Sequence, residues 1–175
     1  MILTGQEIKK QVKMGRLHIR PFIEININPN SYNYRLGKIL LMVIDNIIDP
    51  RKPVKYKKIH LTEKGYILRP GKLYLGSTVE EIGSNYYITS LIGRSSLGRL
   101  GLFLQITADL GQLGAKHCWT LELKVVQPLR VYPRMKIGQV SFWIPEGKDE
   151  IKYKGKYAKY SKPHISELYT ELLSI

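Results

Sequence analysis

The residues best suited to chemistry in this sequence lie in the segment 93–102. It holds two arginines, Arg94 and Arg99, two hydroxyls, Ser95 and Ser96, and three glycines. Guanidinium groups donate paired hydrogen bonds to oxyanions, and glycines let backbone amides come close to them. This composition favours a phosphate site. A surface turn with ordinary basic residues fits equally well, because no Walker lysine follows the glycines.

A second candidate is Glu122, which lies in an apolar and β-branched run at residues 119–125. In an extended strand, alternate side chains share a face, so Glu122 would lie beside Thr120 and Lys124 and opposite the apolar residues. A glutamate on the polar face of a strand is most often simply solvated. The strand pattern alone therefore leaves the role of Glu122 open.

Metal and disulfide chemistry have little support. The sequence has one cysteine, Cys118, and four histidines, His18, His60, His117 and His164. One cysteine forms no internal disulfide, and the histidines lack the spacing of metal ligands. Because adjacent residues on a strand point to opposite faces, we expect structural roles for His117 and Cys118. We predict no zinc site.

The charge is strongly positive, since 28 lysines and arginines face 14 acidic residues, for a net charge of +14. Such a chain attracts polyanions, but the lysines are scattered rather than gathered in one basic block. A solvated basic surface is the simplest interpretation. No signal peptide and no apolar run of bilayer length are visible. We expect one cytoplasmic domain over residues 1–175, with neither a membrane nor a nucleic-acid partner.

The elements that position the candidate residues begin with a short helix. Thr4 and Glu7 form a capping-box pattern, which predicts a helix that ends near Gly15. The apolar period then falls to two, first at residues 17–19 and again at residues 23–27. This period predicts half-buried strands in both places.

A hairpin and further strands follow. A Pro-Gly turn at residues 69–72 separates the apolar runs 66–68 and 73–75, which predicts that the two runs pair. More strands are expected at residues 86–88, 103–106, 119–125, 129–132 and 139–144. Many short strands favour a sandwich, a barrel or a jelly roll. A short helix is predicted at residues 166–172, in a partly flexible tail that begins at about residue 146.

Five segments, in this order, resemble the dCTP deaminases and their bifunctional deaminase-dUTPase relatives. They are residues 1–5, 31–37, 93–102, 120–123 and 153–157. The resemblance spans nearly the whole chain. It implies a mainly β fold, a distorted jelly roll or dUTPase-like barrel with short terminal helices. It also implies a homotrimer with nucleotide sites at the subunit junctions and a tail that closes over the phosphates.

The resemblance also implies roles for particular residues. Ser95, Arg99 and Glu122 would form the catalytic group of a hydrolytic deamination of dCTP to dUTP and ammonia, in which one carboxyl shuttles the protons. The substrate contacts would be Arg94, Ser95, Ser96, Ala108, Gln112, Tyr153, Lys156 and Tyr160. Mg²⁺ would be bound through the triphosphate. Zinc would not be needed, because the zinc-deaminase signature is absent.

The sequence departs from the family pattern in several places. Gln112 stands where relatives usually carry the aspartate of an Asp-Pro-Gly turn, and Asp109 stands where many deaminases have histidine. Asn33 replaces an aspartate of the first motif, and Tyr160 replaces a glutamine of the tail. A neutral amide cannot accept a proton at neutral pH. We therefore expect the reaction to stop at dUTP, with Asp109 as the nearest alternative base.

Two other functions stay open at this stage. A dUTP diphosphatase, or a bifunctional deaminase-diphosphatase, would attack the α-phosphorus of the nucleotide, and Gln112 argues against it. A catalytically weak nucleotide-binding paralogue would keep the phosphate segment and lose parts of the sugar pocket. The departures from the family pattern argue for this third possibility.

Overall fold

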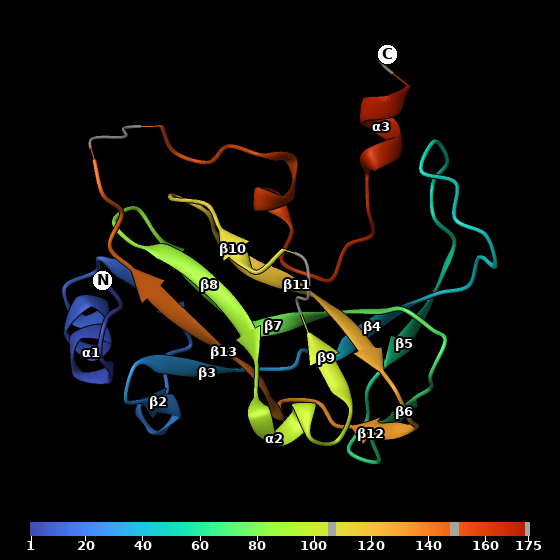
Figure 1. The fold of residues 1–175 in the computed structure, drawn as a ribbon, viewed down its shortest axis with the longest axis horizontal. Helices are drawn as coiled ribbons and strands as arrows, with labels where there is room; N and C mark the ends of the chain where they lie inside the picture. The colour runs from blue at the N-terminus through green and yellow to red at the C-terminus, as the bar shows by residue number, and fades with distance from the viewer. Residues whose placement is uncertain (105–107, 148–150, 174–175) are drawn as a thin grey trace.

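The computed structural model describes residues 1–104, 108–147 and 151–173 of the 175-residue chain. The strands form two large sheets that lie against each other, together with one separate pair (Figure 1). One sheet has the order β5-β4-β7-β11-β9, with β1 added on β7, and the other has the order β10-β8-β13-β3-β2. The two remaining strands, β6 and β12, pair with each other. The mainly β fold expected from the sequence is confirmed.

The strands of the first sheet are β1 (Leu17–Arg20), β4 (Ile39–Val43), β5 (Tyr56–His60), β7 (Tyr74–Ser84), β9 (Leu102–Leu104) and β11 (Lys116–Val125). Those of the second are β2 (Ile27–Asn28), β3 (Ser31–Arg35), β8 (Ile88–Gly93), β10 (Leu110–Gly111) and β13 (Lys136–Trp143). The separate pair consists of β6 (Tyr66–Leu68) and β12 (Leu129–Val131). Jelly-roll connectivity, a single domain over residues 1–175 and a flexible tail remain predictions.

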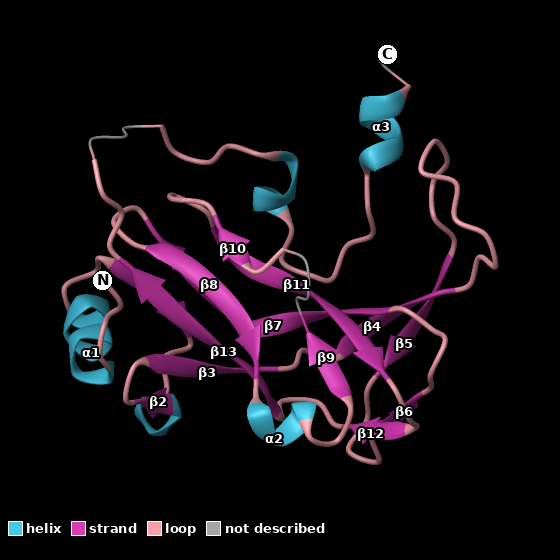
Figure 2. Ribbon diagram, viewed as in Figure 1, coloured by secondary structure: helices cyan, strands magenta, loops and turns pink. Residues whose placement is uncertain are grey.

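The helices are short and lie at the margins of the sheets (Figure 2). They are α1 (Gly5–Lys13), α2 (Ser95–Gly98) and α3 (Leu168–Leu172), with 3-10 turns η1 (Glu24–Asn26) and η2 (Lys156–Lys159). Thr4 caps α1 as predicted, since its Oγ1 accepts a hydrogen bond from the Glu7 amide at 3.4 Å. The Glu7 carboxylate instead accepts from the side chain of the buried Gln11 at 2.5 Å. A buried side-chain amide needs a hydrogen-bond partner, and the Glu7 carboxylate provides it. In a complete capping box, this carboxylate would accept from the Thr4 backbone amide.

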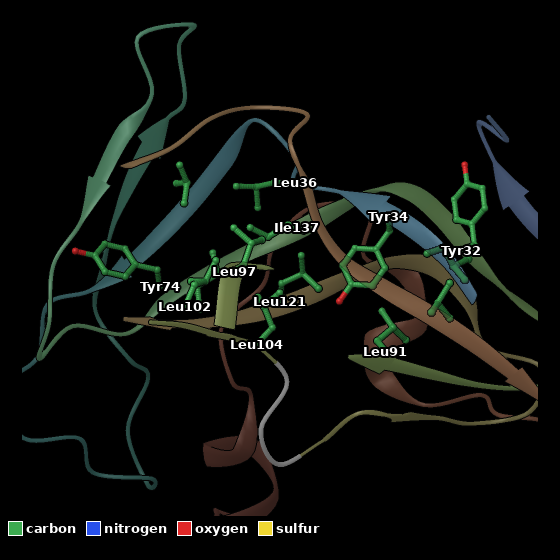
Figure 3. Packing of buried hydrophobic residues seen from close by; sticks show 14 of the residues in the cluster. Tyr32, Tyr34, Leu36, Tyr74, Leu91, Leu97, Leu102, Leu104, Leu121 and Ile137 are labelled. Carbon is green, nitrogen blue, oxygen red and sulfur yellow. The ribbon is translucent and has the colours of Figure 1, made fainter. Parts of the chain in front are cut away.

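The core lies between the two sheets, where buried side chains from both meet (Figure 3). Its largest members include Tyr32 and Tyr34 from β3, Tyr74 from β7 and Phe142 from β13. The Tyr34 hydroxyl donates to the Ile92 carbonyl at 3.0 Å, and burial raises the pKa of this phenol. Each large apolar side chain contributes about 1.5–3 kcal/mol when fully buried, so this layer holds the sheets together.

The long strand β7 carries an irregularity opposite β11. Cys118 pairs with Glu81 and Thr120 with Ser77, so three residues of β7, namely residues 78–80, stand opposite the single residue Trp119. The Thr78 hydroxyl closes the gap, because its Oγ1 accepts from the Trp119 amide at 2.9 Å. It also donates to the Glu80 carbonyl at 2.7 Å. This side chain replaces a missing ladder partner and fixes the register of β11 beyond Trp119.

The same bulge turns a carboxylate into the protein interior. Glu80 is fully buried, and its two oxygens accept from the Arg35 backbone amide at 2.9 Å and from Arg35 Nε at 2.6 Å. Arg35 lies at the end of β3, so the pair joins the two sheets. A buried carboxylate is tolerated only when it is paired and hydrogen-bonded in this way.

Three sequence predictions about strands were wrong. Residues 23–27 form the turn η1 and only a two-residue strand, with Asn26 buried and Ile25 exposed. Tertiary contacts override the alternation there, because the Asn26 carbonyl accepts from Asn33 and the Ile23 amide donates to Tyr32. The start of β8 also lies later than predicted. The amides of Tyr86 and Tyr87 donate to Ser84 Oγ and form a turn rather than a strand.

The predicted hairpin does not form either. The turn is present, with Gly71 at a φ of 73°, but β6 pairs with β12 while β7 joins β4 and β11. The other predicted strands correspond to β1, β9, β11, β12 and β13. Residues 105–106 of the strand predicted at 103–106 lie outside the described residues.

Candidate active site

A cavity of about 530 Å³ lies beside β11. Apolar side chains of β4, β7 and the segment between them, including Val43, Leu73 and Leu75, form one wall. The turn before β11 and the C-terminal tail contribute the polar lining. A mostly apolar cavity with a few polar groups is the usual form of a small-molecule site.

Glu122 lines this cavity, half-buried, as the strand pattern allows. It pairs with Leu75 of β7, while its neighbours Leu121 and Leu123 are fully buried in the core. Because alternate side chains point to opposite faces, these two leucines hold Glu122 toward the cavity. The predicted division of β11 into an apolar and a polar face is confirmed at these positions.

Four more of the predicted substrate residues line the same cavity, namely Ala108, Gln112, Tyr153 and Tyr160. Gln112 begins a tight turn, in which its carbonyl accepts from the Ala115 amide at 3.1 Å and Gly114 has a φ of 90°. The tail is tied to this turn, because the Tyr153 amide donates to the Leu113 carbonyl at 2.8 Å.

The tail covers the cavity through an aromatic cluster. Tyr160 and His164 stack with ring centroids 3.7 Å apart, and both contact Glu167, at 2.5 Å from the Tyr160 hydroxyl and 2.8 Å from His164 Nε2. The hydrogen bond to Glu167 raises the pKa of Tyr160 to about 12. The His164 amide donates to Thr120 Oγ1 at 3.2 Å, two residues before Glu122. His164 was assigned no role from sequence, yet it lies in the cavity wall.

Lys156 lies outside the cavity lining. Its ammonium group contacts Glu171 at 2.6 Å and Thr170 Oγ1 at 3.2 Å, both on α3. The hydrogen bond to Glu171 raises the pKa of Lys156. Lys156, a predicted substrate contact in the tail, is thus paired with a carboxylate in this structure.

The remaining predicted residues form a separate group on and around α2. Arg94, Ser95, Ser96 and Arg99 do not line the cavity, and α2 follows the end of β8 that lies away from β10 (Figure 2). Leu97 is buried and anchors the turn, whereas Ser95, Ser96 and Arg99 are exposed. Arg94 Nη1 donates to the Lys136 carbonyl at 3.3 Å. Within one chain, the structure therefore does not bring the predicted catalytic group of Ser95, Arg99 and Glu122 together.

Two of the departures noted in the sequence have local explanations. Asn33 is buried, and its amide donates to the Asn26 carbonyl at 3.2 Å and to Asn28 Oδ1 at 2.9 Å, which a carboxylate could not do. Asp109 accepts from Ser90 Oγ at 3.0 Å and does not line the cavity. Asp109 is therefore no longer favoured as the alternative base.

His117 and Trp119 of β11 also line the cavity, a position that was not predicted from the sequence. Their rings lie 4.3 Å apart. Cys118, between them, is buried with Sγ 3.8 Å from the Val79 carbonyl, and burial raises its thiol pKa to about 11. Cys118 therefore stays a protonated, structural thiol at neutral pH.

Among residues 1–104, 108–147 and 151–173, no three His, Cys, Asp or Glu side chains are grouped as metal ligands would be. Likewise, no helix in these ranges has the length and apolar character that crossing a bilayer requires. The absence of zinc remains a prediction.

Fold and cavity together define a mainly β protein with a mostly apolar cavity, and among its described lining residues Glu122 is the one acid. A family model described as dCTP deaminase-like matches residues 2–144. The chain is 46% identical over 171 residues to a protein of Hathewaya histolytica named "dCTP deaminase, dUMP-forming", covering 98% of this chain and 99% of that one. A protein of Cytophaga hutchinsonii with the same name is 44% identical over 172 residues, with 98% of each chain covered.

A solved structure agrees on the fold. The crystal structure of 2'-deoxycytidine 5'-triphosphate deaminase from Agrobacterium tumefaciens aligns with a TM-score of 0.66 at 20% identity, covering 82% of this chain and 48% of that chain. This chain thus spans about half the length of that solved protein. The chain belongs to the dCTP deaminase-like family.

Proposed function

We propose that this protein deaminates dCTP and releases diphosphate, so that the final products are dUMP, ammonia and pyrophosphate. The observation that carries the proposal is the Glu122 carboxylate, the one acidic side chain in the described lining of a cavity of nucleotide-compatible size, where the core leucines hold it at the wall. The family assignment and the names of the curated relatives support the substrate.

Deamination requires a group that moves protons at the base. Water adds to C4 of cytosine while Glu122 takes its proton and delivers it to N3, and the C4–N4 bond then breaks as ammonia leaves with a second proton. Ser95 would hold the water and Arg99 would orient Glu122. Gln112, Ala108, Tyr153 and Tyr160 would contact the nucleotide in the cavity.

The proposed end product differs from the one expected from sequence. Gln112 led us to expect that the reaction stops at dUTP. The curated relatives, which are 46% and 44% identical over nearly the whole chain, are named dUMP-forming, and this favours the bifunctional alternative instead. A proton acceptor other than residue 112 must then serve the second step.

A site shared between subunits would bring the residues of α2 next to the cavity residues, which lie apart within one chain. We propose a homotrimer in which α2 of one subunit, with Arg94, Ser95, Ser96 and Arg99, faces the cavity of another. The surface around α2 suits such a contact, because Leu100, Phe103 and Val126 are 48%, 43% and 64% exposed. Exposed apolar side chains that gather on one face mark interaction sites. The two serines and two arginines would bind the triphosphate of the neighbour's nucleotide.

Magnesium would enter as part of the substrate, bound to triphosphate oxygens. The described residues offer no acidic cluster that would hold the ion by itself. Lys156 would exchange Glu171 for a phosphate when the nucleotide arrives. The protein would use neither zinc nor a nucleic-acid partner.

Product analysis tests the proposal. Purified protein is incubated with Mg²⁺ and each of dCTP, dUTP, CTP and dTTP, and ammonia, pyrophosphate and nucleotides are resolved. Ammonia and dUMP from dCTP are expected. Pyrophosphate from dUTP without ammonia from dCTP would indicate a dUTP diphosphatase, and tight binding without any product would indicate a catalytically weak paralogue. A monomer by light scattering at micromolar concentration would exclude the shared site.

A further inference from the structure

The proposed function contains two hydrolytic steps at two places on one nucleotide. Deamination needs a proton acceptor beside the base, and diphosphate release needs one beside the α-phosphate, because each begins with attack by water. Glu122 can serve one of the two positions. The second acceptor must lie elsewhere in the same cavity, since the nucleotide reaches both.

His117 lies in that cavity, five residues before Glu122 on β11. At about 3.3 Å per strand residue, this separation is about 16 Å of strand, enough for a pyrimidine, a sugar and the first phosphate between the two side chains. The turn that carries Gln112 closes two residues before His117, through the hydrogen bond from the Ala115 amide. His117 and Glu122 thus lie at separate points of the cavity lining on the same strand.

The orientation of the His117 ring is held by its neighbours. Nδ1 lies 3.0 Å from the Cys118 carbonyl, which can only accept, so Nδ1 carries the proton and Nε2 has a lone pair. The ring also packs on Trp119, with centroids 4.3 Å apart, and the Trp119 indole is itself held by the Ile82 carbonyl at 2.9 Å. This arrangement is typical of a positioned general base.

Burial favours the neutral imidazole, since it lowers the pKa of His117 below its ordinary value of 6.5. On the neighbouring strand β7, the nearby charged group is Glu81, which pairs with Cys118 and contacts His18 at 3.1 Å. On β11 itself, Lys116 precedes His117. The β7 partner of His117 itself is the apolar Ile82. A neutral imidazole is the form that accepts a proton.

Three other titratable groups of the cavity are less suited to this step. Cys118 holds its proton, because its pKa is raised to about 11. His164 has its Nε2 2.8 Å from Glu167 and its ring stacked on Tyr160. Tyr160 is likewise a poor acceptor, because its hydroxyl donates to Glu167 and its pKa is about 12.

We infer that His117 is the general base for diphosphate release, an inference that rests on the proposed function. Water gives a proton to His117 Nε2 as its oxygen attacks the α-phosphorus. The bond from that phosphorus to the oxygen bridging to the β-phosphate breaks, and pyrophosphate leaves with the bond electrons. The imidazolium then returns its proton to solvent, leaving dUMP.

The test separates the two products of the same enzyme. His117→Gln and His117→Ala are compared with the parent and with His60→Gln, a control at an exposed histidine of β5. In both His117 variants the ratio of pyrophosphate to ammonia formed from dCTP should fall by about 10²- to 10⁴-fold, the range of general-base catalysis, so that dUTP accumulates, whereas His60→Gln should keep the parental ratio. Added imidazole should restore part of the pyrophosphate release in His117→Ala. In the parent, the ratio of pyrophosphate to ammonia should fall as pH drops below the pKa of His117.

Several results would overturn the inference. Pyrophosphate release by His117→Gln at the parental rate would exclude His117 as the base. An equal loss of both products, together with a lower melting temperature, would show a structural role. A parent that makes dUTP and ammonia but no dUMP would remove the second step and leave the deaminase, whereas a parent that forms neither product would refute the proposed function itself.

Discussion

The cavity wall on β11 and the turn at α2 are both rich in polar side chains, but they are built in opposite ways. On β11, Glu122 lies between two fully buried leucines, and its strand is paired on both sides by β7 and β9. At α2 only Leu97 is buried, and Ser95, Ser96 and Arg99 extend into solvent. One region is organised within a single chain, while the other presents donors outward.

The two regions suit two different tasks, proton transfer and triphosphate binding. Proton transfer needs a carboxyl held within hydrogen-bond reach of a defined atom, which a packed strand provides. Triphosphate binding needs several donors around a flexible anion, which an exposed turn of arginines and serines provides. A turn of this kind can serve a neighbouring subunit as readily as its own.

The largest expected effect is at Glu122. Glu122→Gln keeps the shape of the side chain but removes its proton shuttle, so ammonia release from dCTP should fall by about 10²- to 10⁴-fold while dCTP affinity changes little. The matched control is Lys124→Gln, on the same strand face but exposed and outside the cavity. Turnover that persists in Glu122→Gln would refute its catalytic role.

A smaller effect is expected at Arg94. Arg94→Ala removes charge-assisted hydrogen bonds to phosphate, worth about 1.5–3 kcal/mol, so the dissociation constant for dCTP should rise by about 10- to 150-fold. Arg130→Ala is a suitable control, because Arg130 also donates from Nη1 to a backbone carbonyl, that of Lys64 at 2.9 Å. Unchanged affinity in calorimetry would rule Arg94 out as a phosphate ligand.

Mixing the two variants tests whether the regions belong to different subunits. After co-refolding of Glu122→Gln with Arg94→Ala chains, some sites would combine an intact cavity from one chain with an intact α2 from the other. Ammonia release should then exceed the sum of the separate variants. No recovery in mixtures shown to contain both chains would contradict a site shared between subunits.

The smallest expected effect concerns the bulge that sets the register of β11. Thr78→Val leaves the Trp119 amide without its acceptor, so the free energy of unfolding should fall by about 1–3 kcal/mol. Thr78→Ser keeps the hydroxyl and should lose less. Chemical denaturation of both variants measures this difference, and equal stability of the two would show that the hydroxyl does not hold the bulge.

The sequence by itself determined the local features of the protein. The N-cap at Thr4, the alternation that buries Leu121 and Leu123, and the turn at Gly71 were all predicted from neighbouring residues, because each depends on short-range geometry. Glu122 was found as a candidate, and the family resemblance was visible in five ordered segments. These are properties that a few adjacent side chains decide.

Only the tertiary structure decided which segments meet. Residues 23–27 do not form the strand that their alternation predicts, because Asn26 and Tyr32 form hydrogen bonds that favour a turn. The strand β6 pairs with β12 rather than with its predicted partner, β7. His117 was interpreted as structural, since nothing near it in sequence shows that β4, β7 and the tail close a cavity around it. No sequence pattern predicted the separation of Glu122 from α2 either. Strand pairing and burial depend on contacts between distant residues, and no local pattern records them.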